Sequence, residues 1–453
     1  MQALTLGIAI VASAFIFILS PLRGLLVYIV VSVWYPGYLT VKLGTLDFSV
    51  PRIVIIAIYA NIFLHSRLIR QFRFIWLDKI IILFFVAQVV AGITTTPLMM
   101  LLENRSGMAF DAVLPYFAIR MIITTKQQYL NLLKGVLFIS GFVAISGFYQ
   151  SLTGRNPVGF LQKYHAWQDW SGYGENTGSE NLRLGFHRAR FTFSNSIVLG
   201  LYFSMIGPIC TGLWSNVKKN RWLVIIGLCL MPIGTFSSVS SGPFLAAFIA
   251  LMFLAFYYWR RYWRPVVVLI IVMFGLIEII SNRHFWEVID RFTLSSQTAW
   301  YRAQLIEVGL FKGGMSGHWI TGYGFEDPRW CDRIDQRDHT DMVNHYLLIL
   351  ARFGLVGLIP FCIMIVLAFK KLIEANRLCI LEEDKWMIWC IAASLTGLLV
   401  SLFAVSLSLE TTKIFYIMMG FCGVMPSIMR NGIMAKNRLV VNRVVERKAN
   451  IYH

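Results

Sequence analysis

Apolar runs of about 20 residues follow one another along most of this 453-residue chain, separated by short polar breaks. A hydrocarbon core about 30 Å thick needs roughly 20 apolar residues for each helical crossing. Because unpaired backbone groups cannot face lipid, such runs predict a bundle of membrane-spanning helices. The mean hydropathy of +0.65 and a charged fraction of only 14% exclude an ordinary water-soluble domain.

The expected fold class is therefore all-α, a polytopic helical membrane protein with about 12–13 transmembrane helices. The predicted spans lie at 3–20, 24–42, 50–65, 77–95, 107–124, 129–150, 192–213, 222–238, 242–259, 265–281, 342–369, 386–408 and 411–428. The chain divides into N-terminal spans (1–150), a first outward loop (151–191), central spans (192–281), a large outward loop (282–341), C-terminal spans (342–428) and a basic tail (429–453). An alternative pairs the first two runs as a re-entrant hairpin, which moves the N-terminus to the other side of the membrane.

The positive charge of the chain lies in the connections between the apolar runs. The formal net charge of +18 would suggest nucleic acid as the partner of a soluble protein, but here the basic residues orient the spans, so no nucleic acid is expected. Basic clusters begin at Arg67, Lys218, Arg260, Lys370 and Arg430. They alternate correctly with the spans, so the positive-inside rule predicts that all five clusters, and with them the C-terminus, are cytoplasmic. Residues 151–191 and 282–341 then face outward.

Four cationic or titratable side chains close the first outward loop, namely Arg183, His187, Arg188 and Arg190. One interpretation is that interfacial arginines only extend to lipid headgroups. However, orientation of the spans requires basic residues on the opposite side, so a local anionic partner is the better reason for this cluster. The guanidinium fork matches phosphate in a bidentate way and keeps its charge, which makes phosphate the predicted ligand.

The second outward loop carries a dense set of titratable groups. Its arginines are Arg283, Arg291 and Arg302, and they are followed by the segment Gly322-Tyr323-Gly324-Phe325 and by Asp332, Asp335, Asp338 and Asp341. The three-residue spacing of the aspartates would suit a divalent cation on one helix face. We favour a solvated loop neutralised by its own basic residues, and no metal is expected. The glycine segment lacks the Lys-Ser/Thr of a phosphate loop and is interpreted as a backbone turn.

His345 stands at the start of a long apolar run, close to His339 and Asp341. An imidazole in this position can act as a base near neutral pH. The alternative is a hydrogen-bonded interfacial residue at a helix end. Both interpretations stay open on the sequence alone.

Four segments of the chain carry a family likeness when they are taken in order. They are Arg188–Asn195, Ser240–Pro243, Thr298–Arg302 with Gly322–Phe325, and Asn344–Leu347 with Arg352–Leu358. Together they resemble the O-antigen ligase and O-antigen polymerase superfamily, and especially its exopolysaccharide polymerase-like branch. The resemblance covers about residues 110 to 360. The chain departs from the family pattern at Ser196, where proline is usual, and at Val343, where the ligases have a histidine before the asparagine.

The resemblance implies a GT-C-like glycosyltransferase bundle in the inner (cytoplasmic) membrane. It would polymerise or ligate glycans carried by undecaprenyl diphosphate at the periplasmic face, in exopolysaccharide or O-antigen synthesis. By analogy, Arg188 and Arg302 would hold the diphosphate with support from Arg190. Asn344 and Arg291 would contact the substrate.

The same resemblance implies that His345, or alternatively Asp341 or His339, takes the proton of the acceptor hydroxyl. No metal, nucleotide or other cofactor is expected. The expected partners are the lipid-linked donor, a glycan or lipid-linked acceptor, membrane lipid and other polysaccharide-assembly proteins. Four tryptophans of the outward loops would either stack on sugar faces or form an interfacial belt, and they are Trp167, Trp170, Trp300 and Trp319.

The rival hypothesis is a transporter that flips the lipid-linked sugar. Transporters usually carry charges within the membrane and show internal repeats. The sequence shows no repeat, and its ionisable residues concentrate at one face, which favours the enzyme. Ligase and polymerase differ in the acceptor rather than in the donor chemistry, so the sequence does not separate them.

Overall fold

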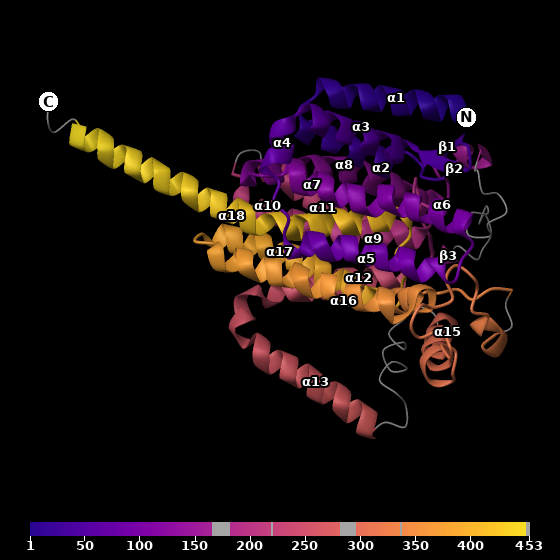
Figure 1. The fold of residues 1–453 in the computed structure, drawn as a ribbon. Coiled ribbons are helices and arrows are strands. Elements are labelled where there is room, and N and C mark those ends of the chain that lie inside the picture. Colours follow the sequence, from indigo (N-terminus) through magenta and orange to yellow (C-terminus); the bar gives the residue numbers. More distant parts are fainter. Residues whose placement is uncertain (165–181, 219–220, 281–295, 336–337, 450–453) are drawn as a thin grey trace.

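The computed structural model of the protein describes residues 1–164, 182–218, 221–280, 296–335 and 338–449. Most helices lie side by side in one bundle, from which α13 and the C-terminal part of α18 extend away (Figure 1). The first half contains α1 (Gln2–Ile18), α2 (Pro21–Trp34), α3 (Val50–Leu64), α4 (Ser66–Gln71), α5 (Trp76–Ile93), α6 (Leu98–Met108), α7 (Leu114–Ile122) and α8 (Lys126–Thr153). The second half contains α9 (Ser196–Thr211), α10 (Leu213–Asn216), α11 (Arg221–Ser237), α12 (Ser241–Ala255), α13 (Trp263–Ile280), α15 (Ser296–Ile306), α16 (His345–Leu378), α17 (Glu382–Ser401) and α18 (Leu409–Ala449).

The predicted fold class is confirmed at the level of an all-α, multi-pass membrane protein. Among the described residues, six helices are long and apolar enough to cross a membrane, namely Trp76–Ile93, Lys126–Thr153, Ser196–Asn216, Ser241–Ile280, His345–Leu378 and Glu410–Met434. Shorter apolar helices accompany them at Gln2–Ile18, Pro21–Trp34, Val50–Leu64 and Arg221–Ser237. Each predicted span overlaps a helix. The predicted number of crossings and the likeness to the GT-C class stay predictions.

The predicted span 24–42 is longer than the helix that the structure contains. Helix α2 ends at Trp34, because Pro36 has no N–H and its ring disfavours helical backbone in the residue before it. The chain then forms an antiparallel hairpin of β1 (Thr40–Leu43) and β2 (Leu46–Ser49). Apolar residues that suggested a membrane helix therefore pair as strands at the end of the bundle.

Large apolar side chains cover the outside of the bundle. Phe138 is 81% exposed and Val366 is 64% exposed, which is costly in water but favourable against acyl chains. Inside the bundle, small residues allow close approach. A Cβ on Gly397 of α17 would lie 2.3 Å from the carbonyl oxygen of Ala246 in α12, so these two helices are in backbone contact.

The two ends of the bundle carry different segments. The hairpins β1–β2 and β3 (Leu182–Arg183) with β4 (Phe186–His187) lie at one end together with α15, and we call this the loop end (Figure 1). Helices α4 and α10 and the emerging C-terminal part of α18 lie at the opposite end. The described parts of both predicted outward loops thus share one end of the bundle. The assignment of that end to the periplasm stays a prediction.

Two groups of charged side chains are buried inside the bundle, and the sequence analysis did not foresee them. Asp111 accepts hydrogen bonds from Arg52 Nε at 3.0 Å and Arg52 Nη2 at 2.5 Å, and Lys413 Nζ lies 3.3 Å from its other oxygen. Asp78 is paired with Arg120 Nε at 2.9 Å in a second group. Charges in an apolar bundle are stable only when they are paired, so these groups fix which helices are neighbours.

We predict that Asp111→Asn destabilises the protein, because it leaves Arg52 and Lys413 as buried cations around a neutral amide. Removing one partner of a buried ion group costs about 3–5 kcal/mol. The variant should therefore show a clearly lower apparent melting temperature in detergent.

A matched control is Glu374→Gln, which removes ion pairs to Lys371 and Arg430 at the protein surface. Its expected cost is only about 0–1 kcal/mol. Equal melting temperatures for Asp111→Asn and Glu374→Gln would show that the buried group of Arg52, Asp111 and Lys413 contributes no more to stability than a surface ion pair.

Candidate functional site

The first predicted arginine segment lies against the turn between α11 and α12. Arg188 Nη2 donates a hydrogen bond to Ser240 Oγ at 3.0 Å, and the backbone N–H of Ala189 donates to the carbonyl oxygen of Ser237 at 2.9 Å. The segment beginning at Arg188 and the small-residue segment beginning at Ser240 both belong to the family likeness. The structure therefore brings together two of the four segments on which the likeness rests.

The chain turns sharply just after this contact. Phe191 has a φ of +50°, and the side-chain oxygen of Gln150 accepts hydrogen bonds from the N–H groups of Arg190 (3.1 Å) and Phe191 (2.8 Å). Burial raises the pKa of Tyr38 to about 12, and the charge of Arg190 opposes that rise, so Arg190 and Tyr38 are close. The backbone at Arg190 and Phe191 is thus held by Gln150 near the end of α8.

Arg188 is a partly buried cation at the end of the first outward loop. Within the described part of the chain it hydrogen bonds only to the neutral Ser240 hydroxyl, and its Nε has no hydrogen-bond partner. Burial, together with the charge of Arg183, lowers the pKa of Arg188 to about 10. The guanidinium is still charged at neutral pH, and a half-buried charge of this kind is stabilised by an anion.

The second outward loop forms a small hydrophobic core on the start of α16. Its members include Tyr301, Leu305, Val308, Met315, Trp330, Leu347 and Leu350. Arg302 on α15 is only 6% exposed beside this core. The hydroxyl of Tyr301 accepts a hydrogen bond from the backbone N–H of Asp341 at 2.9 Å. Arg302, Asp341 and the start of α16 thus belong to one packed unit.

His345 and Asn344 both take part in fixing the start of α16. The side chain of Asn344 caps the helix by accepting from Leu347 N at 3.1 Å, so its amide oxygen is occupied. His345 Nδ1 accepts a hydrogen bond from Leu407 N at 3.3 Å. In a neutral ring the proton then lies on Nε2, and the ring cannot accept another proton unless it releases Leu407.

The aspartates of the second loop do not share a helix face. In the described part of this stretch, only Trp330–Arg333 forms a helical turn, and Asp332 pairs with Arg329 at 3.0 Å. Asp341 and His339 are exposed. Among the described residues, no group of three or more His, Cys, Asp or Glu side chains is placed to hold a metal ion.

Some predicted residues have no described counterpart. Arg283, Arg291, Trp167 and Trp170 lie outside the residues that the structure describes, so the predicted substrate contact of Arg291 stays untested. Trp300 and Trp319 are described, and both are partly exposed.

The loop between α17 and α18, residues 402–408, contacts both arginine-bearing units. Its Val405 packs on Gly242 at the start of α12, directly after the turn that holds Arg188. On its other side, the backbone N–H of Leu407 donates the hydrogen bond to His345 Nδ1 described above. This loop therefore stands between the Arg188 segment and the unit that contains Arg302, at the loop end of the bundle.

The Gly-x-Gly segment pairs with a break in α16. Tyr323 N donates to the Ala351 oxygen at 2.7 Å, and Gly324 N donates to the Arg352 oxygen at 3.0 Å. In return, Leu355 N donates to the Trp319 oxygen at 2.8 Å. At Gly354 the backbone has φ +59° and ψ −159°, which only glycine adopts readily. The segment takes up the backbone groups that the break leaves without helical partners.

Sequence analysis missed two further arginines at this place. Arg105 and Arg352 both lie over the ring of Phe325, with guanidinium carbons 5.2 and 5.5 Å from its centroid. Arg105 stands in the polar break between two predicted spans on the outward side, which was the available signal. Arg352 begins the Arg352–Leu358 segment of the family likeness, which by itself predicts no contact with Arg105.

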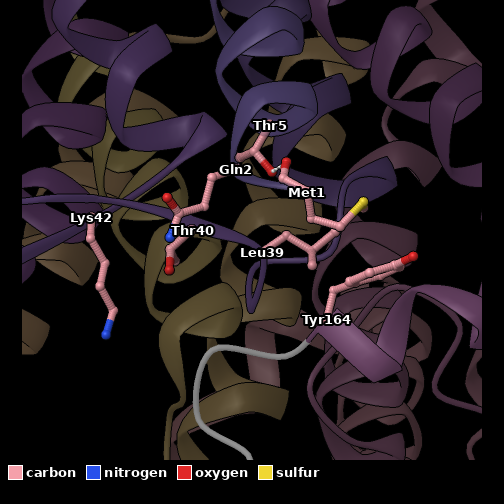
Figure 2. Close-up of a pocket in the computed structure, with 7 residues that line it drawn as sticks. All are labelled: Met1, Gln2, Thr5, Leu39, Thr40, Lys42 and Tyr164. Atoms are coloured by element: carbon pink, nitrogen blue, oxygen red, sulfur yellow. Dashed lines mark hydrogen bonds between the residues drawn. The ribbon is translucent and has the colours of Figure 1, made fainter.

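A cavity of about 250 Å³ lies beside the β1–β2 hairpin, and Figure 2 shows its lining of Met1, Gln2, Thr5, Leu39, Thr40, Lys42 and Tyr164. The Lys42 side chain points away from the other labelled residues. Thr5 Oγ1 donates a hydrogen bond to the carbonyl oxygen of Met1 at 3.1 Å. Because none of the predicted site residues lines this cavity, the candidate site is defined by the arginine-bearing units instead.

Comparison with known proteins found no matching family model and no matching curated protein. The resemblance to the O-antigen ligase and polymerase superfamily therefore stays a prediction from the four segments.

We predict that Gly354→Ala disrupts the pairing between the Gly-x-Gly segment and α16. The added Cβ would lie 2.1 Å from the carbonyl oxygen of Ile320, and the backbone conformation itself costs a non-glycine residue about 1–3 kcal/mol. A lower melting temperature and faster proteolysis of the second loop are expected.

Gly7→Ala in α1 is the control, because a Cβ there meets nothing within 4 Å. It should behave as the parent protein does. If Gly354→Ala were as stable and as protease-resistant as Gly7→Ala, the break in α16 would not depend on glycine.

Proposed function

We propose that the protein is a membrane glycosyltransferase. It transfers a glycan from undecaprenyl diphosphate to an acceptor hydroxyl at the periplasmic face of the inner membrane, as a polymerase or ligase of exopolysaccharide or O-antigen. The observation that carries the proposal is Arg188, a half-buried cation at the loop end whose described partner is a neutral hydroxyl. The second support is that segments of the family likeness, far apart in sequence, contact each other in pairs.

The proposed glycan transfer requires cations that bind the leaving diphosphate and a base for the acceptor hydroxyl. The acceptor oxygen bonds to the anomeric carbon of the donor, and the bond from that carbon to the diphosphate breaks. The leaving group gains negative charge, so cations that bind it lower the barrier. Arg188 and Arg302 are proposed to bind that diphosphate, with Arg190 in support.

The proton of the acceptor hydroxyl needs a base, and two candidates differ in their surroundings. His345 Nδ1 is engaged by Leu407 N, which leaves the proton of the neutral ring on Nε2. Asp341 is exposed, and its backbone is tied to Tyr301, next to Arg302. This geometry favours Asp341 as the base and His345 as a hydrogen-bond donor.

A transporter of lipid-linked sugar is the second candidate, and the buried charges of Arg52, Asp111 and Lys413 favour it. Asp111 pairs with both of these cations, which suits a structural role equally well. The two functions separate in proteoliposomes. An enzyme lengthens or transfers the glycan, whereas a transporter moves it unchanged across the bilayer.

We predict that Arg188→Gln and Arg302→Gln each abolish glycan transfer by the purified protein. The assay incubates the protein with a lipid-linked repeat unit, with and without a separate acceptor, and measures glycan length. Loss is expected because each variant removes one cation that stabilises the leaving diphosphate. Arg260→Gln, at a surface pair with Glu382, is the control and should retain activity. Parent activity in both site variants would remove the proposed diphosphate site.

The base is identified by a second comparison. Loss of a general base reduces the rate by roughly 10²–10⁴-fold. Asp341→Asn should show such a loss, with His345→Gln retaining more activity because glutamine can still donate a hydrogen bond. The reverse order of the two rates would assign the base to His345.

A further inference from the structure

Arg105 and Arg352 form a second cationic group at the loop end. They come from α6 and α16, and their guanidinium carbons lie 5.2 and 5.5 Å from the centroid of the same Phe325 ring. Arg105 also lies 5.0 Å from the centroid of Phe353. The two positive charges are close enough to repel each other.

No carboxylate within the described part of the chain pairs with either guanidinium. Arg105 is 7% exposed and donates to the amide oxygens of Gln88 and, at 2.7 Å, Asn104, while its Nε has no hydrogen-bond partner. Arg352 is exposed at the rim of the group. A buried cation with neutral partners, held beside a second cation, is stabilised by an anion that contacts both.

Aromatic contact alone explains this arrangement less well. One arginine over an aromatic ring is a common stabilising contact. Here both arginines lie over the Phe325 ring, so the two guanidinium charges repel each other. The buried charge groups of the bundle show the alternative clearly, because Arg52 and Arg120 each have an aspartate partner.

The group formed by Arg105 and Arg352 lies close to His345, which belongs to the proposed reaction site. The charge of Arg352 reaches the His345 ring, and Phe325 N donates to Thr96 Oγ1 at 3.4 Å, between α5 and α6. The Arg188 segment is linked to His345 only indirectly, because the α17–α18 loop packs on Gly242 through Val405 and donates to the His345 ring through Leu407 N. The two cationic groups are therefore related to His345 through different parts of the fold.

We propose that Arg105 and Arg352 bind the phosphate group of a lipid-anchored acceptor, so that the protein joins two polyprenyl diphosphate-linked glycans. This inference rests on the proposed function and decides between its two forms, in favour of a polymerase. In the transfer, the acceptor hydroxyl loses its proton to the base and bonds to the donor anomeric carbon. The donor lipid leaves as polyprenyl diphosphate, and the diphosphate bond of the acceptor is untouched.

The test counts lipid molecules bound to the purified protein by native mass spectrometry, with polyprenyl diphosphate that carries no sugar as the probe. The parent protein should bind two. Arg352→Gln and Arg105→Lys should bind one, with at least a tenfold weaker second step, and the lipid that they retain shows that they are folded. Arg188→Gln should also bind one lipid molecule. The double variant Arg188→Gln/Arg352→Gln should bind none, and the control Arg260→Gln should bind two.

The outcomes separate this inference from the proposed function. A second lipid that survives Arg352→Gln and Arg105→Lys overturns the second site, whatever the activity assay gives. Loss of that lipid in a protein without transferase activity keeps the site but overturns the proposed function. The same binding measurement is repeated with inorganic diphosphate and with polyprenol as probes. Equal binding of inorganic diphosphate would overturn the lipid-anchored ligand, and equal binding of polyprenol would overturn recognition of phosphate.

Discussion

The pairing of residues 319–324 with residues 351–356 is the contact on which the loop end depends. It replaces helical hydrogen bonds that α16 loses at Gly354, where the backbone conformation excludes other residues. Because the second outward loop supplies the new partners, that loop is attached to a membrane helix by backbone hydrogen bonds. Phe325 follows directly and carries Arg105 and Arg352 on its ring.

The same logic extends to the other arginine segment. Arg188 is held by the α11–α12 turn, and residues 402–408 touch both that turn and His345. One buried ion group joins α3, residues 109–113 and α18, and a second joins α5 and α7, so both fix neighbouring helices of the bundle. Among the described residues at this end, Arg188 and Arg105 donate hydrogen bonds to neutral side chains.

The helices were predictable because length and hydropathy are local properties of the chain. The shared end of the two outward loops followed from the alternation of the basic clusters. Other features arise only from packing between distant segments. Gly354 lies inside an apolar run and looks helical, and the Gly322 segment that breaks the helix is about thirty residues away. Arg105 gained meaning only beside Arg352, and the hydrogen bond from Leu407 to His345 changes which candidate suits the role of base.

The central claim is that Arg188 and Arg302 hold one diphosphate between them. Cryo-electron microscopy of the protein in lipid nanodiscs with polyprenyl diphosphate tests this most directly. Phosphate density within hydrogen-bonding distance of both guanidinium groups is the predicted result. Arg188 and Arg302 facing separate ligands, or density that touches neither, would contradict it.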